Sequence, residues 1–219
     1  MDRTGMSRPE LRFRLPGRWF SVDLSSEDAT RSSIRTIARE AIGPADDRAP
    51  ERARVRQQLQ QAAEAGDRGG ARAIMFSTEI TPGTPLPVTL VVFEPEDLRM
   101  SPAIGTSADA VLKVMGESLK QIDPAAYETM AKVRGPGVPA LRTHRVDLLD
   151  EGQLEGIVRL VVDYWIPVPD SKHVLMVRFS TPLGELENVM RALFDEFIAV
   201  AYFSAGRPES LRDQLLPRR

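Results

Sequence analysis

The side chains best suited to acid–base chemistry in this chain are its two histidines, His144 and His173. Neither belongs to an H-x-H or H-E-x-x-H motif, so neither has the spacing that places two imidazoles on one zinc ion. A serine triad would need one of them together with a G-x-S-x-G turn, and no such turn occurs. The pattern predicts that His144 is a hydrogen-bonded strand residue and that His173 is a solvated residue beside a turn.

A second candidate is an acidic cluster around a predicted turn, formed by Asp147, Asp150, Glu151 and Glu155. An EF-hand loop places oxygen ligands at alternate positions and closes with a glutamate. Here Leu148 and Leu149 interrupt the ligand positions, and Val158 stands where the closing acid would be. The cluster is therefore predicted to be a solvated hairpin tip. No metal ion and no cofactor is expected.

The third candidate is a set of charged and large side chains on the less apolar face of a predicted sheet: Arg145, Arg159, Asp163, Trp165, Met176 and Arg178. They form either a ladder of cross-strand ion pairs, each contributing roughly a few tenths of a kcal/mol, or a concave binding face. On such a face Trp165 and Met176 would contact a partner while the charges fix its register. Both interpretations stay open, and this face is the predicted partner-binding site.

The composition indicates a globular domain. The 219 residues are 42% hydrophobic and 27% charged, which is enough to bury a core. With a net charge of −2, and with Arg52, Arg54 and Arg56 pointing around a helix, nucleic acid is not an expected partner. Only four of the 29 basic residues are lysines, and a GC-rich genome explains this bias at least as well as bidentate anion recognition does.

Three further classes of protein are excluded or disfavoured by composition. The absence of cysteine excludes disulfides, thiolate metal sites and cysteine nucleophiles. The segment Met1–Pro9 is polar and does not resemble a signal peptide. No apolar run approaches the roughly 18 residues of a membrane span. The sequence therefore predicts a cytoplasmic protein without direct membrane insertion.

The segment from Gly156 to Ser204 must position the third candidate site. It predicts two paired strands, Ile157–Ile166 and Val174–Thr181, because apolar residues alternate along the first and fill the second. Thr181 is expected to be the N-cap and Pro182 the first residue of a long amphipathic helix that ends near Gly206.

The upstream chain predicts further strands and helices from alternation, caps and turn residues. The expected elements are a hairpin of Leu11–Leu15 with Trp19–Leu24, a helix from Ser25 or Ser26 to Ile42, a surface helix from Pro50 to Ala65, strands Ala71–Ile80 and Pro87–Phe93, a helix from Thr106 or Ser107 to Ile122, a short helix to Lys132, and strand Ala140–Leu149.

The predicted organisation is one α+β domain over residues 11–204, with a helical insertion at about 46–66. Residues 1–10 are expected to be disordered and residues 205–219 to form a mobile tail. The strand Val88–Phe93 is apolar on both faces, so it is expected at the centre of a sheet covered on both sides.

Four segments resemble the PsbP-like fold family: Arg18–Leu24, Tyr164–Pro169, Val174–Pro182 and Phe194–Ile198. The resemblance spans roughly Leu11–Ser204. The four segments are similar to those of bacterial, actinobacterial-type members of the family. It implies an antiparallel β-sheet flanked by helices on both faces, an α/β/α sandwich. It also implies a binding module, because the family has no common catalytic residues to carry over.

The function expected from these observations is that of a non-enzymatic protein-binding adaptor or chaperone. The expected partner is a secreted effector or its apolar helix. Whether the chain also forms a homodimer is left open. The alternative is a small-molecule or lipid-binding domain with a cavity between sheet and helices. An enzyme is the third interpretation. It would require mutually bonded titratable side chains, and a pairing of His144 with a buried carboxylate would favour it.

Overall fold

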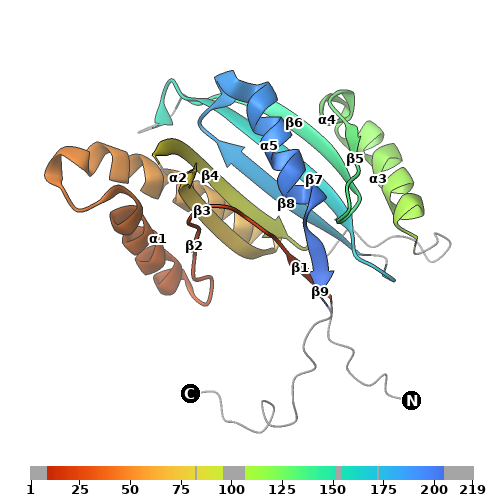
Figure 1. Ribbon diagram of the computed structural model, residues 1–219, viewed down its shortest axis with the longest axis horizontal. Helices are drawn as coiled ribbons and strands as arrows, with labels where there is room; N and C mark the ends of the chain where they lie inside the picture. Colours follow the sequence, from red (N-terminus) through yellow and green to blue (C-terminus); the bar gives the residue numbers. More distant parts are fainter. Residues whose placement is uncertain (1–8, 82, 96–106, 151–153, 172, 205–219) are drawn as a thin grey trace, which may run out of the picture.

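The computed structural model describes residues 9–81, 83–95, 107–150, 154–171 and 173–204. Its centre is a seven-stranded antiparallel sheet in the order β2-β3-β4-β8-β7-β6-β5, and a separate two-stranded sheet pairs β1 with β9 (Figure 1). Helices lie on both faces of the large sheet. The predicted α+β class, an antiparallel sheet flanked by helices, is therefore confirmed.

The strands are β1 (Glu10–Arg12), β2 (Phe20–Ser21), β3 (Ala71–Thr81), β4 (Thr84–Phe93), β5 (Ala131–Val133), β6 (Ala140–Leu148), β7 (Val158–Pro167), β8 (Val174–Thr181) and β9 (Tyr202–Ser204). The α-helices are α1 (Glu27–Ile42), α2 (Ala49–Gly69), α3 (Ala108–Ile122), α4 (Pro124–Glu128) and α5 (Glu187–Ala199). Single 3₁₀ turns, η1 (Asp46–Arg48) and η3 (Gly184–Leu186), precede α2 and α5.

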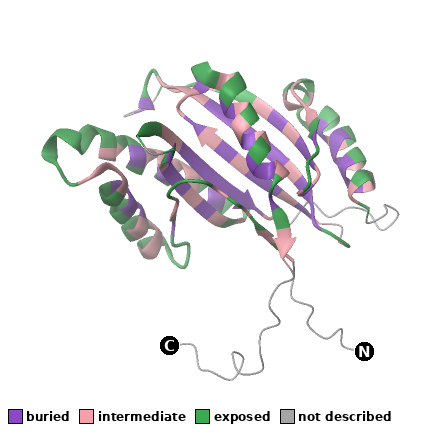
Figure 2. Cartoon of the chain, in the orientation of Figure 1, coloured by how far each residue is buried: buried purple, intermediate pink, exposed green. Residues whose placement is uncertain are grey.

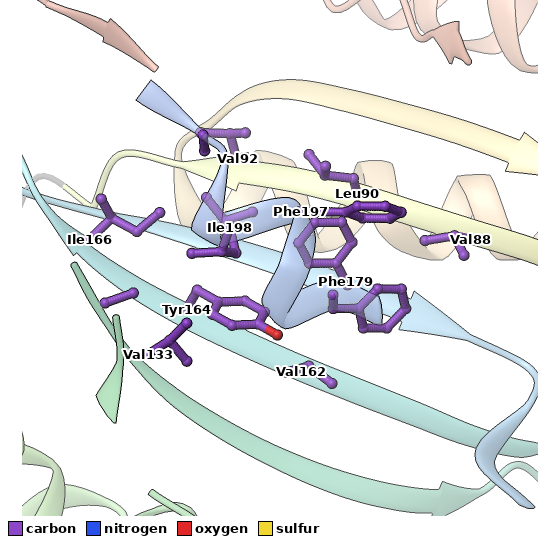
Figure 3. Packing of buried hydrophobic residues seen from close by; sticks show 14 of the residues in the cluster. Val88, Leu90, Val92, Val133, Val162, Tyr164, Ile166, Phe179, Phe197 and Ile198 are labelled. Carbon is purple, nitrogen blue, oxygen red and sulfur yellow. The ribbon is translucent and has the colours of Figure 1, made fainter. Parts of the chain in front are cut away.

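One face of the sheet, called here the α5 face, carries the larger core. Alternate residues of β4, β7 and β8 point toward α5 and are fully buried, among them Tyr164 and Phe179 (Figure 3). Phe179 stacks on Phe194 of α5 with ring centroids 4.6 Å apart. Tyr164 meets Phe179 edge-on at 5.9 Å. This aromatic group fixes α5 to the centre of the sheet.

The opposite face, called here the α2 face, is covered by two separate helical groups. Helices α1 and α2 pack on β3 and β4, and α3 packs on the β6–β7 side through residues such as Leu112 and Met115 (Figure 2). The predicted surface helix corresponds to α2, and its predicted apolar stripe faces the sheet, with Val55 and Leu59 buried and Leu59 0% exposed. Its small residues allow close contact: a Cβ on Gly66 would lie 2.9 Å from the Cβ of Ala71.

The predicted N-terminal hairpin is wrong. Strand β1 pairs with β9, and β2 pairs with β3. Gly17 has φ +77°, and a Cβ there would lie 2.6 Å from the carbonyl oxygen of Glu79, so the chain passes closely over the end of β3. Alternation showed which side chains are apolar, but it did not specify the partner strand.

The start of the last helix differs from its prediction. Thr181 pairs with Leu160 as the last residue of β8 and caps no helix. Gly184 then approaches Val158, where a Cβ would lie 2.6 Å from Cγ1 of the valine. This contact is made by the turn η3, and α5 begins only at Glu187.

The end of that helix differs as well. Helix α5 ends at Ala199, whose carbonyl oxygen accepts a hydrogen bond of 2.8 Å from the backbone N–H of Gly137. The following residues form β9 instead of a further turn of helix. Similarly, the short helix predicted to reach Lys132 ends at Glu128, and β5 follows it.

The predicted terminal segments fall largely outside the described residues, which exclude 1–8 and 205–219. Glu10, placed in the disordered segment by prediction, pairs with Ser204 in the small sheet. The helical insertion at 46–66 corresponds to η1 and most of α2, and its status as an insertion stays a prediction.

Candidate functional site

All six residues of the predicted binding face lie on the α2 face of the sheet. Strand β6 contributes Arg145, β7 contributes Arg159, Asp163 and Trp165, and β8 contributes Met176 and Arg178. Asp163 lies directly opposite Arg178, and Trp165 lies opposite Met176. The period of two along each strand therefore placed these residues together, as the sequence indicated.

The centre of this face is an ion pair between the buried Asp163 and the partly buried Arg178, whose side chain is 28% exposed. The Nε and Nη2 atoms of Arg178 donate to the two carboxylate oxygens of Asp163 at 2.6 and 2.8 Å. Burial lowers the pKa of Arg178, but the hydrogen bond to Asp163 and the charges of Asp163 and Asp147 outweigh burial and raise that pKa. The guanidinium also lies over the ring of Phe93 at 5.7 Å. It is therefore held in one orientation.

A second carboxylate extends the network toward the strand ends. Asp147 accepts hydrogen bonds from Arg145 at 3.3 Å and from Arg159 at 3.0 Å. Nη1 of Arg145 also approaches Asp163 at 3.8 Å. Three guanidinium groups thus share two carboxylates. Asp147 belongs to the acidic cluster predicted as a solvated tip, of which Glu151 lies outside the described residues.

The two large apolar members of the predicted face are covered by helices. Met176 is 9% exposed and belongs to the core formed with α1 and α2. Trp165 is half-buried and packs both on that core and on the cluster around α3. The three arginines of the face are more exposed to solvent than Met176 and Asp163.

The arginines border a cleft of about 340 Å³, called here the arginine cleft. Arg145, Arg159 and Arg178 line it from the sheet, and Arg68 lines it from α2. The rest of the lining is mixed: polar residues are Gln58, Gln61, Asp150, Ser180 and Thr181, and apolar ones include Ala62, Ala65, Val161, Leu154 and Ile157. The cleft therefore combines positive charge with a partly apolar wall.

A second charged group, which the sequence interpretation did not assemble, lies on the α5 face. Nε2 of His144 lies 3.0 Å from a carboxylate oxygen of Glu187 and 2.9 Å from Nη1 of Arg191. Arg191 also donates to Glu187 at 2.8 Å. The signal was the spacing of four between Glu187, Arg191 and Asp195, which places all three on one side of the helix.

Asp195 continues this group toward the core. The hydroxyl of Tyr164 donates to Asp195 at 2.7 Å, and Arg142 of β6 donates to the same carboxylate. Burial and then the charge of Asp195 raise the pKa of Tyr164, so the phenol stays protonated. The tyrosine hydroxyl and the carboxylate thereby satisfy each other's hydrogen-bonding groups beneath α5.

The pairing that would favour an enzyme is present only in part. His144 does contact a carboxylate, but the side chain of Glu187 is 34% exposed and is already bonded to Arg191. Nδ1 of His144 is buried and has no hydrogen-bond partner in the part of the chain that the structure describes. These contacts join β6 to α5, which is the role of a structural histidine.

We expect stability to fall as pH falls below about 6.5, the ordinary histidine pKa, because His144 stays neutral in the fold. Burial, followed by the charge of Arg191, lowers the pKa of His144, while Glu187 opposes them and Arg142 adds to the lowering. The unfolded chain therefore binds a proton that the folded chain does not, and stability rises with pH in this range.

Melting temperatures at about pH 8 and about pH 5.5 measure this effect. The His144→Gln variant should lose less stability between the two pH values than the wild type loses. Equal losses in both proteins would contradict the expected neutral histidine.

Another cleft lies on the α5 face, beside β1 and β9, and is called here the terminal groove. It has a volume of about 1390 Å³. Its apolar lining comes from the N-terminal segment and from β3, β4 and β8: Leu11, Phe13, Trp19, Met75, Val92 and Leu175. Charged residues also line it, and two of them, Arg72 and Glu94, bond to each other at 2.7 Å. His173, predicted to be solvated, is half-buried in this lining.

Two classes of feature are absent from the described part of the chain. No three His, Asp or Glu side chains gather there in a way that could hold a metal ion. Among the helices described, none combines the length and the apolar character needed to cross a bilayer.

Comparison with known proteins gives similarity to solved structures but not to a protein family. No protein-family model matches the sequence, and no curated protein matches it either. Among solved structures, the chain is similar to LpqN, a protein involved in cell envelope biogenesis of Mycobacterium tuberculosis, with 12% identity and a TM-score of 0.42. The similarity covers 92% of this chain and 87% of LpqN. A similarity of this size carries no inference about function, and membership of the PsbP-like family stays a prediction.

Proposed function

We propose that the protein is a non-enzymatic adaptor or chaperone that binds an extended apolar segment of another protein in the terminal groove. The volume of this groove, about 1390 Å³, is the observation that carries the proposal. It exceeds the roughly 300–1,000 Å³ of ordinary small-molecule pockets. A segment of polypeptide fits such a groove better than a compact metabolite does.

The chemistry of the lining supports the same kind of partner. Phe13, Trp19 and Met75 are half-buried and offer apolar and aromatic surface. Aromatic residues and methionine are enriched where proteins bind other proteins. Arg12 and Glu10, which also line the groove, bond to each other at 2.6 Å and supply polar edges that can set the register of a bound segment. In its finer form the proposal names a secreted effector, recognised in the cytoplasm, as the partner.

Site-specific photocrosslinking tests this proposal. A photoreactive residue at position 75, within the groove, should yield a discrete crosslinked protein in the native cytosol. The matched control carries the same residue at position 122, because Ile122 is 79% exposed on α3 and lies outside the groove.

The captured segment, as a synthetic peptide, should then bind at least about tenfold more weakly to a Leu175→Asp variant, a difference of about 1.4 kcal/mol. Equal crosslinking at positions 75 and 122, or equal affinity for both proteins, would refute the groove as the binding site.

A second candidate is a lipid or another apolar small molecule in the same groove, which the apolar lining formed by Leu11, Val92 and Leu175 favours. Native mass spectrometry of the protein purified from its own cells distinguishes the two. A stoichiometric small molecule that Leu175→Asp removes, without a crosslinked protein, would replace the adaptor with this second function.

A further inference from the structure

We propose that the arginine cleft is a second binding site, for a small organic acid that carries one carboxylate on an apolar body. The cleft lies on the α2 face, on the opposite side of the sheet from the terminal groove. The inference is therefore independent of the proposed function, and either can fail without the other.

The charge of the cleft favours an anion. Its lining contains Arg68, Arg145, Arg159 and Arg178 but, among carboxylates, only Asp150. The carboxylates Asp147 and Asp163 pair with the sheet arginines in the network described above. Even when both are counted, four positive charges face three negative ones. Arg68 is exposed and has no ion-pair partner among the residues that the structure describes. One further negative charge would balance the site.

The guanidinium groups are held ready to bind. Arg178 uses Nε and Nη2 on Asp163, which leaves Nη1 without an acceptor in the described part of the chain. Arg159 uses Nη2 on Asp147, which leaves Nη1 for a ligand, while its Nε is buried and out of reach. The guanidinium fork matches the geometry of a carboxylate, and side chains already anchored lose less conformational entropy when they bind it.

The volume and the apolar lining of the cleft indicate which chemical group carries the carboxylate of the ligand. A volume of about 340 Å³ lies at the lower end of the range for small-molecule sites. Beside polar residues such as Gln61 and Ser180, the lining includes Ala62 and Ala65 of α2 and the apolar Leu154 and Ile157. Apolar surface of this kind gains free energy only from a ligand with a hydrocarbon part. An aryl or short-chain carboxylic acid fits both halves, whereas inorganic phosphate satisfies only the charged half.

Calorimetric titration with four probes tests the charged part and the apolar part of the cleft separately. Phenylacetate supplies the carboxylate and the apolar body, acetate the carboxylate alone, 2-phenylethanol the apolar body alone, and inorganic phosphate a different anion. At constant ionic strength, phenylacetate should bind at least about tenfold more tightly than any of the other three. Tighter binding of phosphate, or binding of phenylacetate no tighter than that of acetate, would overturn the proposal.

Two arginine substitutions on one helix separate site binding from the general effect of charge. Arg68→Gln removes a cleft residue, and Arg54→Gln removes an exposed arginine of α2 that lies outside the cleft. Phenylacetate should bind about tenfold more weakly to the first variant and unchanged to the second. Equal weakening in both would show unspecific attraction and refute the site.

Amide chemical shifts locate the ligand directly. Phenylacetate should shift the signals of Gln61, Ile157 and Ser180, which line the cleft. Shifts confined to the terminal groove, for example at Met75, would contradict the inference even if the ligand binds.

Discussion

The Asp163→Ala variant should lose about 2–4 kcal/mol of unfolding free energy, somewhat less than the roughly 3–5 kcal/mol for one partner of a fully buried ion pair, because the Arg178 side chain is 28% exposed. Asp163 is 7% exposed and receives both hydrogen bonds of the Arg178 fork. Without the carboxylate, a largely buried guanidinium has lost its main counter-charge. Urea denaturation at neutral pH measures the loss.

A control and a rescue sharpen this prediction. Asp150→Ala removes an exposed carboxylate of the same cleft and should change stability by less than about 0.5 kcal/mol. The double variant Asp163→Leu with Arg178→Met removes both charges and should recover most of the loss, because an apolar pair of similar volume often replaces a buried ion pair without cost. A double variant as unstable as Asp163→Ala would contradict the explanation by an uncompensated charge.

The Phe194→Ala variant should lose about 3–5 kcal/mol, through a different mechanism. Phe194 is 0% exposed and stacks on Phe179 at 4.6 Å, so its removal leaves a cavity between α5 and the sheet. Chemical denaturation again measures the effect.

Val189→Ala is the matched control, because Val189 lies on the same helix but is 64% exposed. It should change stability by less than about 0.5 kcal/mol. A loss in Val189→Ala as large as that in Phe194→Ala would contradict the explanation by core packing, because alanine is the better helix former at both positions.

Local signals in the sequence predicted the elements that depend on few residues. Ser26 caps α1 by accepting a hydrogen bond from the backbone N–H of Ala29, and β8 has the predicted bounds. The apolar strand β4 lies between β3 and β8 with both faces covered, as continuous hydrophobicity indicates.

Elements that depend on distant contacts were not predictable in this way. Thr181-Pro182 has the local form of a helix start, yet the ladder with Leu160 keeps Thr181 in the strand. Strand β5 has only three residues, too few for a period to be seen. In each case a tertiary contact outweighed the local preference.

The candidate site was likewise predictable only where it depends on local signals. Alternation placed Arg145, Asp163 and Arg178 on one face, because side-chain direction follows from the strand itself. It could not show that α2 covers Met176 and leaves a cleft over the arginines, since that depends on how closely the helix packs. The group around His144 was missed because three of its members come from α5, whose position over β6 is set by the core.

The pairing of β1 with β9 has a consequence for the order of folding. Glu10 pairs with Ser204, so this small sheet closes almost the whole described chain into one loop. Such a contact forms only after the loop-closure entropy is offset by other contacts, which makes it a late step in folding and an early step in unfolding. Three residues from each strand hold it. Since Glu10, Arg12, Tyr202 and Ser204 also line the terminal groove, one wall of that groove can open by local unfolding while the seven-stranded sheet stays intact.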